Sequence, residues 1–287
     1  MATVAPIDLD RTVVQRRRGA LAFRTMRVPD RLSLGALAVV ILIGVFGPLL
    51  EPHNPTLASG LPYQSPNWSF PFGTDDAGRD MLSRCLSGLQ VTLFSGLAIV
   101  AIGLLVGGAI GLIAGAAGGW IDGVLMRITD LFLALPAPVL AIAVVAAIGP
   151  SLEHTLVAIS ILWWPYYARI VRTEVRGLAA RPHIEAARLA GTSRSRRLLR
   201  HLLPGAVPTA IVAASLDLGG AIALLASLSF LGLGAQPPAS ELGSMTATGV
   251  ADLQTSWWLP AIPGLLVFLL CLVANVAGDT VRDLVDR

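Results

Sequence analysis

Few residues of this chain could carry covalent or metal chemistry. Asp75, Asp76 and Asp80 stand close enough together to suggest a calcium site, but the ligand spacing and closing glutamate of an EF-hand are missing. We therefore expect Thr74 or Asp75 to cap the helix that follows. The two cysteines are far apart, the four histidines are scattered, and no nucleophile motif of the G-x-S-x-G type occurs. These features argue against a zinc site, a disulfide scaffold and a hydrolase.

The 21 basic residues are all arginines, so the chain contains no lysine. The lack of lysine excludes the P-loop nucleotide site, whose lysine reaches the β- and γ-phosphates. It also excludes Schiff-base chemistry. The sequence therefore predicts a protein that is not an enzyme, holds no cofactor of its own and draws energy from a partner or a gradient.

Asp217 is the one acidic residue inside the apolar stretch 201–240. A carboxylate within the bilayer is costly and usually faces a cavity or a partner. Asp217 could line a translocation path and meet a substrate amino group. Alternatively, it pairs with a neighbouring chain or lies near the cytoplasmic end of its helix.

The composition is that of a membrane protein. Hydrophobic residues make up 54% of the 287 residues and charged residues 14%, and the mean hydropathy is +0.72. A soluble domain carries about 25% charged residues, and a helix needs about 20 mostly apolar residues to cross a bilayer. We expect an all-α membrane protein with six transmembrane helices. Their apolar stretches are 32–50, which serves as an N-terminal anchor helix, 85–121 with a Gly-rich loop at its end, 131–152, 154–168, 201–240 and 253–278.

The placement of arginine predicts the orientation in the membrane. Nineteen of the 21 arginines fall in segments that face the cytoplasm if the N-terminus is inside, and only Arg79 and Arg84 fall outside. We therefore expect both termini in the cytoplasm, and the net charge of +3 to reflect topology rather than nucleic-acid binding. The expected organisation is a cytoplasmic tail 1–31, a first transmembrane helix 32–50, an extracytoplasmic segment 51–88, a transmembrane domain 89–278 with an outer loop 231–256, and a cytoplasmic tail 279–287.

The second apolar stretch carries glycines at every fourth position. This spacing places them on one helix face, where small residues let a neighbouring helix approach closely. We expect this face to pack against another helix rather than to line a substrate groove. The glycines are Gly103, Gly107, Gly111, Gly115 and Gly119.

The long basic loop 176–204 has the features of a docking element. Pro182 suits the first turn of a helix, and Glu185 suits its positive N-terminal end. Gly191 can end that helix in a left-handed conformation. Ala186 and Ala187 give it a surface of little bulk, suited to a groove on another protein. A second amphipathic piece is expected to carry Leu198, Leu199, Leu202 and Leu203 on one side, before Pro204 opens the next span.

This loop resembles the EAA loop of binding-protein-dependent ABC importers. Glu185-Ala186-Ala187, Gly191 and Leu203-Pro204 match the motif in type and spacing, while His201 replaces an aliphatic residue. The segments Phe72–Asp80 and Ser229–Pro238 are similar to outer segments of the C-type permease subunits of dipeptide, oligopeptide and nickel importers.

The resemblance implies a type I ABC importer transmembrane domain in a bacterial inner membrane. It also implies a homologous second permease, two ATPase subunits that hold ATP and Mg²⁺, and an extracytoplasmic binding protein. Short peptides, dipeptides foremost, are the expected cargo, moved by alternating access and coupled through the EAA loop. The alternatives are a nickel or other small-solute permease of the same family, an ion-coupled secondary transporter, and a membrane scaffold.

Overall fold

The computed structural model describes residues 28–286, and every regular element in that part of the chain is helical. This result confirms the all-α expectation. The expected tail 1–31 lies almost wholly outside the described residues. The elements are α2 (Val28–Phe46), η4 (Gly47–Leu50), α3 (Met81–Ala117), α4 (Gly119–Leu133), α5 (Ala137–Ile148), α6 (Leu152–Ala179), α7 (Pro182–Leu189), α8 (Arg194–Arg197), η5 (Leu198–Leu202), α9 (Leu203–Phe230), α10 (Leu242–Gly249), η6 (Val250–Asp252) and α11 (Trp258–Asp286).

Four of the described helical segments are long and apolar enough to cross a membrane. A fifth is counted if α4 and α5 form one broken span, since the two helices are bent by 82°. Helix α6 is not among them, and its second half carries Arg169, Arg172 and Arg176. The four segments are Val28–Leu50, Met81–Ala117, Arg194–Phe230 and Trp258–Val285.

The expected third span, 131–152, is not one helix. Helix α4 ends at Leu133, and α5 begins at Ala137 after Pro136. Proline disfavours helical backbone in the residue before it, and it cannot donate the amide hydrogen bond that would continue the helix. The apolar run therefore divides between two helices of different direction.

The expected loop at the end of the second span is also absent. Helix α3 continues through its glycines to Ala117 and ends at Gly118, whose φ is +63°. At 1.5 Å per residue, its 37 residues extend about 55 Å, well beyond a hydrocarbon core of about 30 Å. Gly119 belongs to α4 and does not share the face of the other four glycines.

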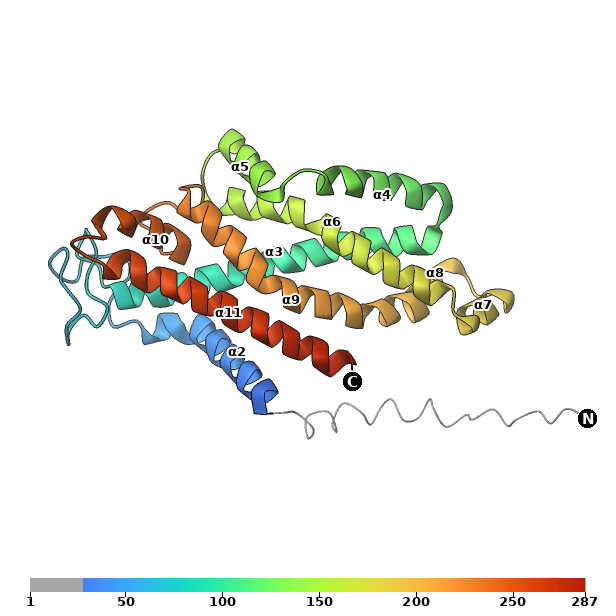
Figure 1. The fold of residues 1–287 in the computed structure, drawn as a ribbon, viewed down its shortest axis with the longest axis horizontal. Coiled ribbons are helices and arrows are strands. Elements are labelled where there is room, and N and C mark those ends of the chain that lie inside the picture. The colour runs from blue at the N-terminus through green and yellow to red at the C-terminus, as the bar shows by residue number, and fades with distance from the viewer. Residues whose placement is uncertain (1–27, 287) are drawn as a thin grey trace, which may run out of the picture.

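The helices run lengthwise between two distinct ends (Figure 1). Segment 51–80 and α10 lie at one end, and α7 and α8 lie at the other. Helix α3 packs along α6, α9 crosses both, and α11 lies between α9 and α2. The core forms where α3, α6 and α9 meet, around Ile99, Ile159 and Leu225, each fully buried.

The end that contains segment 51–80 is ordered by polar contacts. Asp80, rather than Thr74 or Asp75, caps α3, and its carboxylate accepts hydrogen bonds from the backbone N–H groups of Leu82 and Ser83. Asp75 pairs instead with Arg79 at 2.6 Å. These aspartates therefore build a local structure that positions the start of α3.

Candidate functional site

Helix α7 is a short element held by one buried side chain. Pro182 occupies its first turn, and Ile184, only 6% exposed, points into the protein. Glu185 and Ala186 are exposed, and Ala187 is half-buried. The helix therefore exposes Glu185 and small alanines beside His183, Arg188 and Leu189, and Ile184 anchors it to the bundle.

Gly191 forms the turn that ends this element. Its φ is +78°, a conformation that side-chain-bearing residues rarely adopt. The Gly191 N–H donates to the Arg188 carbonyl at 3.0 Å, and the Thr192 N–H donates to the Ala187 carbonyl at 3.1 Å. The turn thus satisfies helix-end carbonyls and redirects the chain toward α8.

The second part of the loop differs from its expected amphipathic pattern. Leu202 is buried against Leu178 and Ala206, but Leu199 is 59% exposed and Leu203 is 38% exposed. The cause is backbone geometry, because residues 198–202 form a π-helical turn that shifts the side-chain register. Leu203 starts α9, and Pro204 occupies its first turn.

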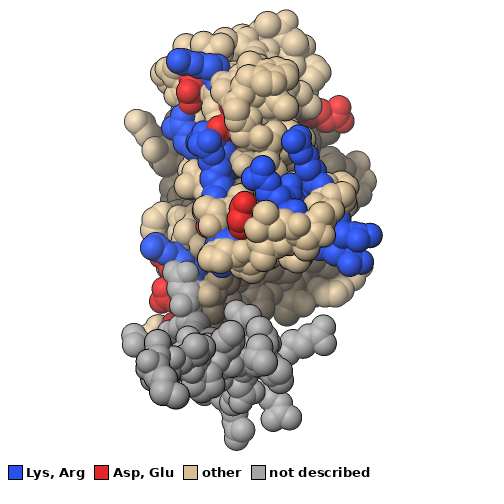
Figure 2. All heavy atoms as spheres, turned by 90° about the vertical axis from the view of Figure 1, so that its right-hand side faces the viewer, with Lys and Arg blue, Asp and Glu red and all other residues tan. Residues whose placement is uncertain are grey.

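A cavity of about 420 Å³ separates α7 and α8 from the ends of α3 and α6. Its charged lining residues are Glu185, Arg188, Arg194 and Arg197, and its apolar wall includes Ile113. Figure 2 shows the end of the molecule that carries α7 and α8, where arginines far outnumber acidic residues. This surface is strongly basic and open.

The four glycines of α3 lie against α6, three of them against its backbone. We call Gly103, Gly107, Gly111 and Gly115 the glycine face. All four are buried. A Cβ atom at Gly103 would meet Trp163 and Tyr167 at 3.2 Å, and one at Gly115 would meet the Arg172 carbonyl oxygen at 2.9 Å. The face therefore brings two helix backbones into direct contact, which gains dispersion energy in lipid.

Asp217 lies on α9 and is held by two side chains of α6. Its Oδ2 atom accepts hydrogen bonds from the Trp163 indole N–H and from the Tyr167 hydroxyl, the latter at 2.9 Å. Its Oδ1 atom accepts no hydrogen bond from the described residues, and the side chain is half-buried. The sequence did not identify Trp163 and Tyr167 as partners of Asp217, so this triad was missed. Aromatic N–H and O–H groups four residues apart on one helix were the available signal.

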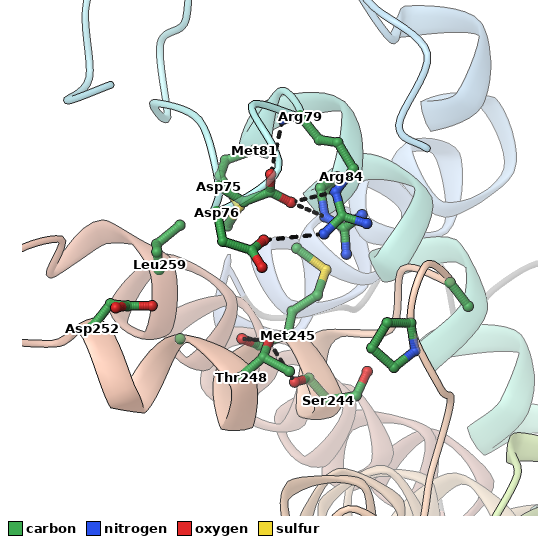
Figure 3. Close-up of a pocket in the computed structure, with 13 residues that line it drawn as sticks. Asp75, Asp76, Arg79, Met81, Arg84, Ser244, Met245, Thr248, Asp252 and Leu259 are labelled. Carbon is green, nitrogen blue, oxygen red and sulfur yellow. Dashed lines mark hydrogen bonds and ion pairs between the residues drawn. The ribbon is translucent and has the colours of Figure 1, made fainter. Parts of the chain in front are cut away.

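A smaller polar cavity of about 110 Å³ lies at the opposite end, between segment 75–84 and α10 (Figure 3). Asp75, Asp76, Arg79 and Arg84 line one wall, and Ser244, Met245, Thr248 and Asp252 lie on or near α10 opposite them. Arg84 also donates to the carbonyl oxygen of Pro238 at 3.3 Å. This contact fastens segment 231–256 to the start of α3.

Comparison with known proteins decides the family. Residues 107–287 match the family described as the inner-membrane component of binding-protein-dependent transport systems. The chain belongs to this family. It is an integral membrane permease subunit with several spans, a transport component rather than an enzyme.

Curated relatives resemble the chain over most of its length. It is 39% identical over 254 residues to the probable D,D-dipeptide transport system permease protein DdpC of Escherichia coli K12, covering 87% of this chain and 84% of that protein. It is 38% identical to the di/tripeptide transport system permease protein DppC of Pseudomonas aeruginosa UCBPP-PA14, covering 88% of this chain and 87% of that protein.

Solved structures share the fold at lower identity. An inward-facing MetNI methionine ABC transporter matches with a TM-score of 0.58 and 20% identity, covering 71% of this chain and 97% of that chain. An amino acid ABC transporter with histidines matches with a TM-score of 0.53 and 20% identity, covering 68% and 91%. The expected fold of an ABC importer transmembrane domain is confirmed at this level.

Proposed function

We propose that this permease imports short peptides, dipeptides foremost, by alternating access in an ATP-driven complex of the bacterial inner membrane. The observation that carries the proposal is the likeness to peptide permeases, which extends over 87% or more of the chain at 38–39% identity. Such coverage includes both ends of the molecule, where a binding protein and ATPases would dock.

The proposed complex has four further components. A homologous second permease completes the path, two ATPase subunits bind ATP and Mg²⁺, and an extracytoplasmic binding protein delivers the solute. The family description supports a binding-protein-dependent system. The exposed surface of α7 supports docking, because its small side chains leave the helix free to enter a groove.

In this proposal the coupling loop 176–204 receives the motion of the ATPases. Glu185, Ala186 and Ala187 form the docking surface of α7, Gly191 forms the turn, and Leu203-Pro204 joins the loop to α9. Helix α6 leads into α7 through only Ala180 and Arg181, so a displacement of α7 acts directly on the bundle.

We further propose six spans with both termini in the cytoplasm. Helix α2 serves as the N-terminal anchor, the bent pair α4–α5 as the third span and α6 as the fourth. The start of α2 and the end of α11 lie together, since the Ser33 and Thr280 hydroxyl groups are 2.6 Å apart. Both ends of the described chain therefore leave the bundle on the same side.

Asp217 is the proposed residue of the translocation path. Trp163 and Tyr167 satisfy one carboxylate oxygen and fix the side chain, and the second oxygen accepts no bond from the described residues. A half-exposed carboxylate does not face lipid without a large cost. It therefore suits a water-filled path, where it would attract the ammonium group of a peptide.

The test is uptake by the reconstituted complex of two permeases and two ATPases in proteoliposomes. Labelled dipeptide should accumulate only with ATP, Mg²⁺ and the binding protein, and excess nickel should not compete. Import by this permease alone, driven by an ion gradient, would overturn the proposal. Competition by nickel would leave the assignment as an ATP-driven importer unchanged, but the proposed cargo would then be nickel rather than a dipeptide.

A further inference from the structure

Helix α4 buries polar rather than large apolar side chains against the bundle. Among its fifteen residues, the buried ones are Asp122 and Thr129. Large apolar side chains of α4 face outward instead, with Trp120 78% exposed and Leu131 69% exposed. In a soluble protein such a helix would lack a hydrophobic reason to stay in place. Its contacts with α6 include the edge-on ring pair of Phe132 and Trp164 and the buried carboxylate of Asp122.

Asp122 binds the guanidinium group of Arg172 on α6 in a bidentate pair. Arg172 Nε donates to Asp122 Oδ1 at 2.6 Å, and Arg172 Nη2 donates to Asp122 Oδ2 at 2.7 Å. Arg176, one turn further along α6, adds a contact at 3.4 Å to the same carboxylate. The Asp122 side chain is only 7% exposed. Parallel charge-assisted hydrogen bonds of this type fix both distance and orientation.

The backbone of Arg172 is held on its other side by α3. A Cβ atom at Gly111 would lie 2.9 Å from the Arg172 nitrogen, and one at Gly115 would lie 2.9 Å from the Arg172 oxygen. The backbone of Arg172 is therefore fixed by the glycine face, while its side chain holds α4. Arg172 joins three helices at one point.

This junction lies on the element that leads into α7. Arg172 lies seven positions before Ala179, the last residue of α6, which is about two helical turns. A displacement of α7 reaches Arg172 before it reaches the membrane-embedded half of α6. Any helix that is joined to Arg172 must then move with it.

We propose that the Asp122–Arg172 pair is a coupling device, which makes the cytoplasmic halves of α3, α4 and α6 move as one body when the ATPases displace α7. Asp122 and Arg172 are positioning residues that carry the displacement to α4 and the bent span beyond it. The inference rests on the proposed function, in which the ATPases act on α7.

The variants Asp122→Asn and Arg172→Gln test this role in the full complex, reconstituted with the binding protein. Asp122→Asn keeps the size of the side chain, Arg172→Gln shortens it, and each variant removes one charge. The complex should assemble and hydrolyse ATP, while the number of dipeptides imported per ATP should fall by about fivefold or more, the lower range of typical coupling factors. The double variant should import no fewer dipeptides per ATP than the poorer single variant, because both changes remove the same interaction.

The matched control is the neighbouring pair Asp130–Arg169. It links the same two helices at 2.6 Å, but its side chains are 51% and 55% exposed. Exposed pairs contribute little, so Asp130→Asn should leave import per ATP unchanged. Because Arg172→Lys keeps the charge but loses the bidentate fork, it should give an intermediate ratio.

Two results would overturn the inference. One is a wild-type ratio of import to hydrolysis in both single variants. The other is a parallel loss of hydrolysis, import and complex yield, which would show a purely structural pair. Failure of the proposed function is distinguishable, because the wild-type complex would then import no dipeptide in the same vesicles.

Discussion

The glycine face of α3 offers a matched pair of substitutions within one helix. Gly111 faces α6, whereas a Cβ atom at Gly108 would find no atom within 4 Å. Replacing either glycine by alanine removes the same intrinsic helix penalty of about 1 kcal/mol. The difference between Gly111→Ala and Gly108→Ala therefore isolates the contact between α3 and α6.

The structure sets the magnitude of that difference. A Cβ atom at Gly111 would lie 2.9 Å from the Arg172 nitrogen and 3.1 Å from the Ala168 carbonyl carbon, and it would be closer still to the Ala168 oxygen. All of these are backbone atoms, so no side-chain rotation can relieve the overlap and the helices must separate. Inserting a methyl group into a well-packed site typically costs about 1–3 kcal/mol.

The measurement is thermal stability of the purified permease, co-expressed with its partner subunits and followed by size-exclusion chromatography after heating. Gly111→Ala should lose its native peak several degrees below Gly108→Ala, because about 1 kcal/mol shifts Tm by about 2–4 °C in chains of comparable size. Gly111→Leu should also reduce the yield of assembled complex. Equal melting of the two alanine variants would refute the packing argument.

Three further predictions concern the coupling loop and the path. Gly191→Val should leave the protein inserted but stop dipeptide uptake, because φ of +78° is strained for a β-branched residue. Gly191→Asn should retain uptake, because asparagine tolerates this conformation. Full uptake in the valine variant would show that transport does not need the turn at Gly191. Glu185→Lys should reduce co-purification of the ATPases more than Glu185→Gln, and unchanged recovery would show that Glu185 only starts a helix. Asp217→Asn should raise the KM for dipeptide uptake with little loss of complex, and wild-type kinetics would remove Asp217 from the path.

Much of the helical framework could be predicted from apolar runs and helix-end residues. Helices α2 and α11 lie where stretches without acidic residues or arginine indicate them, and α9 lies in the apolar stretch 201–240, which is interrupted by Asp217. Helix α7 begins at Pro182 and gives way to a left-handed glycine at Gly191. These features depend on a residue and its near neighbours in the chain, so a single sequence contains the information.

The failures all involve contacts between distant residues or turn geometry. The glycines near the end of α3 favour a loop by local propensity, yet the helix continues because α6 packs directly against them. Pro136 lies within an apolar run that suggested a single span, and the chain bends there by 82° between α4 and α5. The partners of Asp217 lie 50 and 54 residues away along the chain.

These failures share a physical cause in the membrane environment. Lipid is as apolar as a leucine side chain, so hydrophobicity does not indicate which helices pack together. Close backbone contact at Gly111 and a buried ion pair at Asp122 supply that information instead. Both converge on Arg172, which hydropathy counts only as a charge that weakens the case for α6 as a span. Hydropathy does not distinguish Arg172 from Arg169 and Arg176 on the same helix, so only its contacts in space show that Arg172 joins three helices.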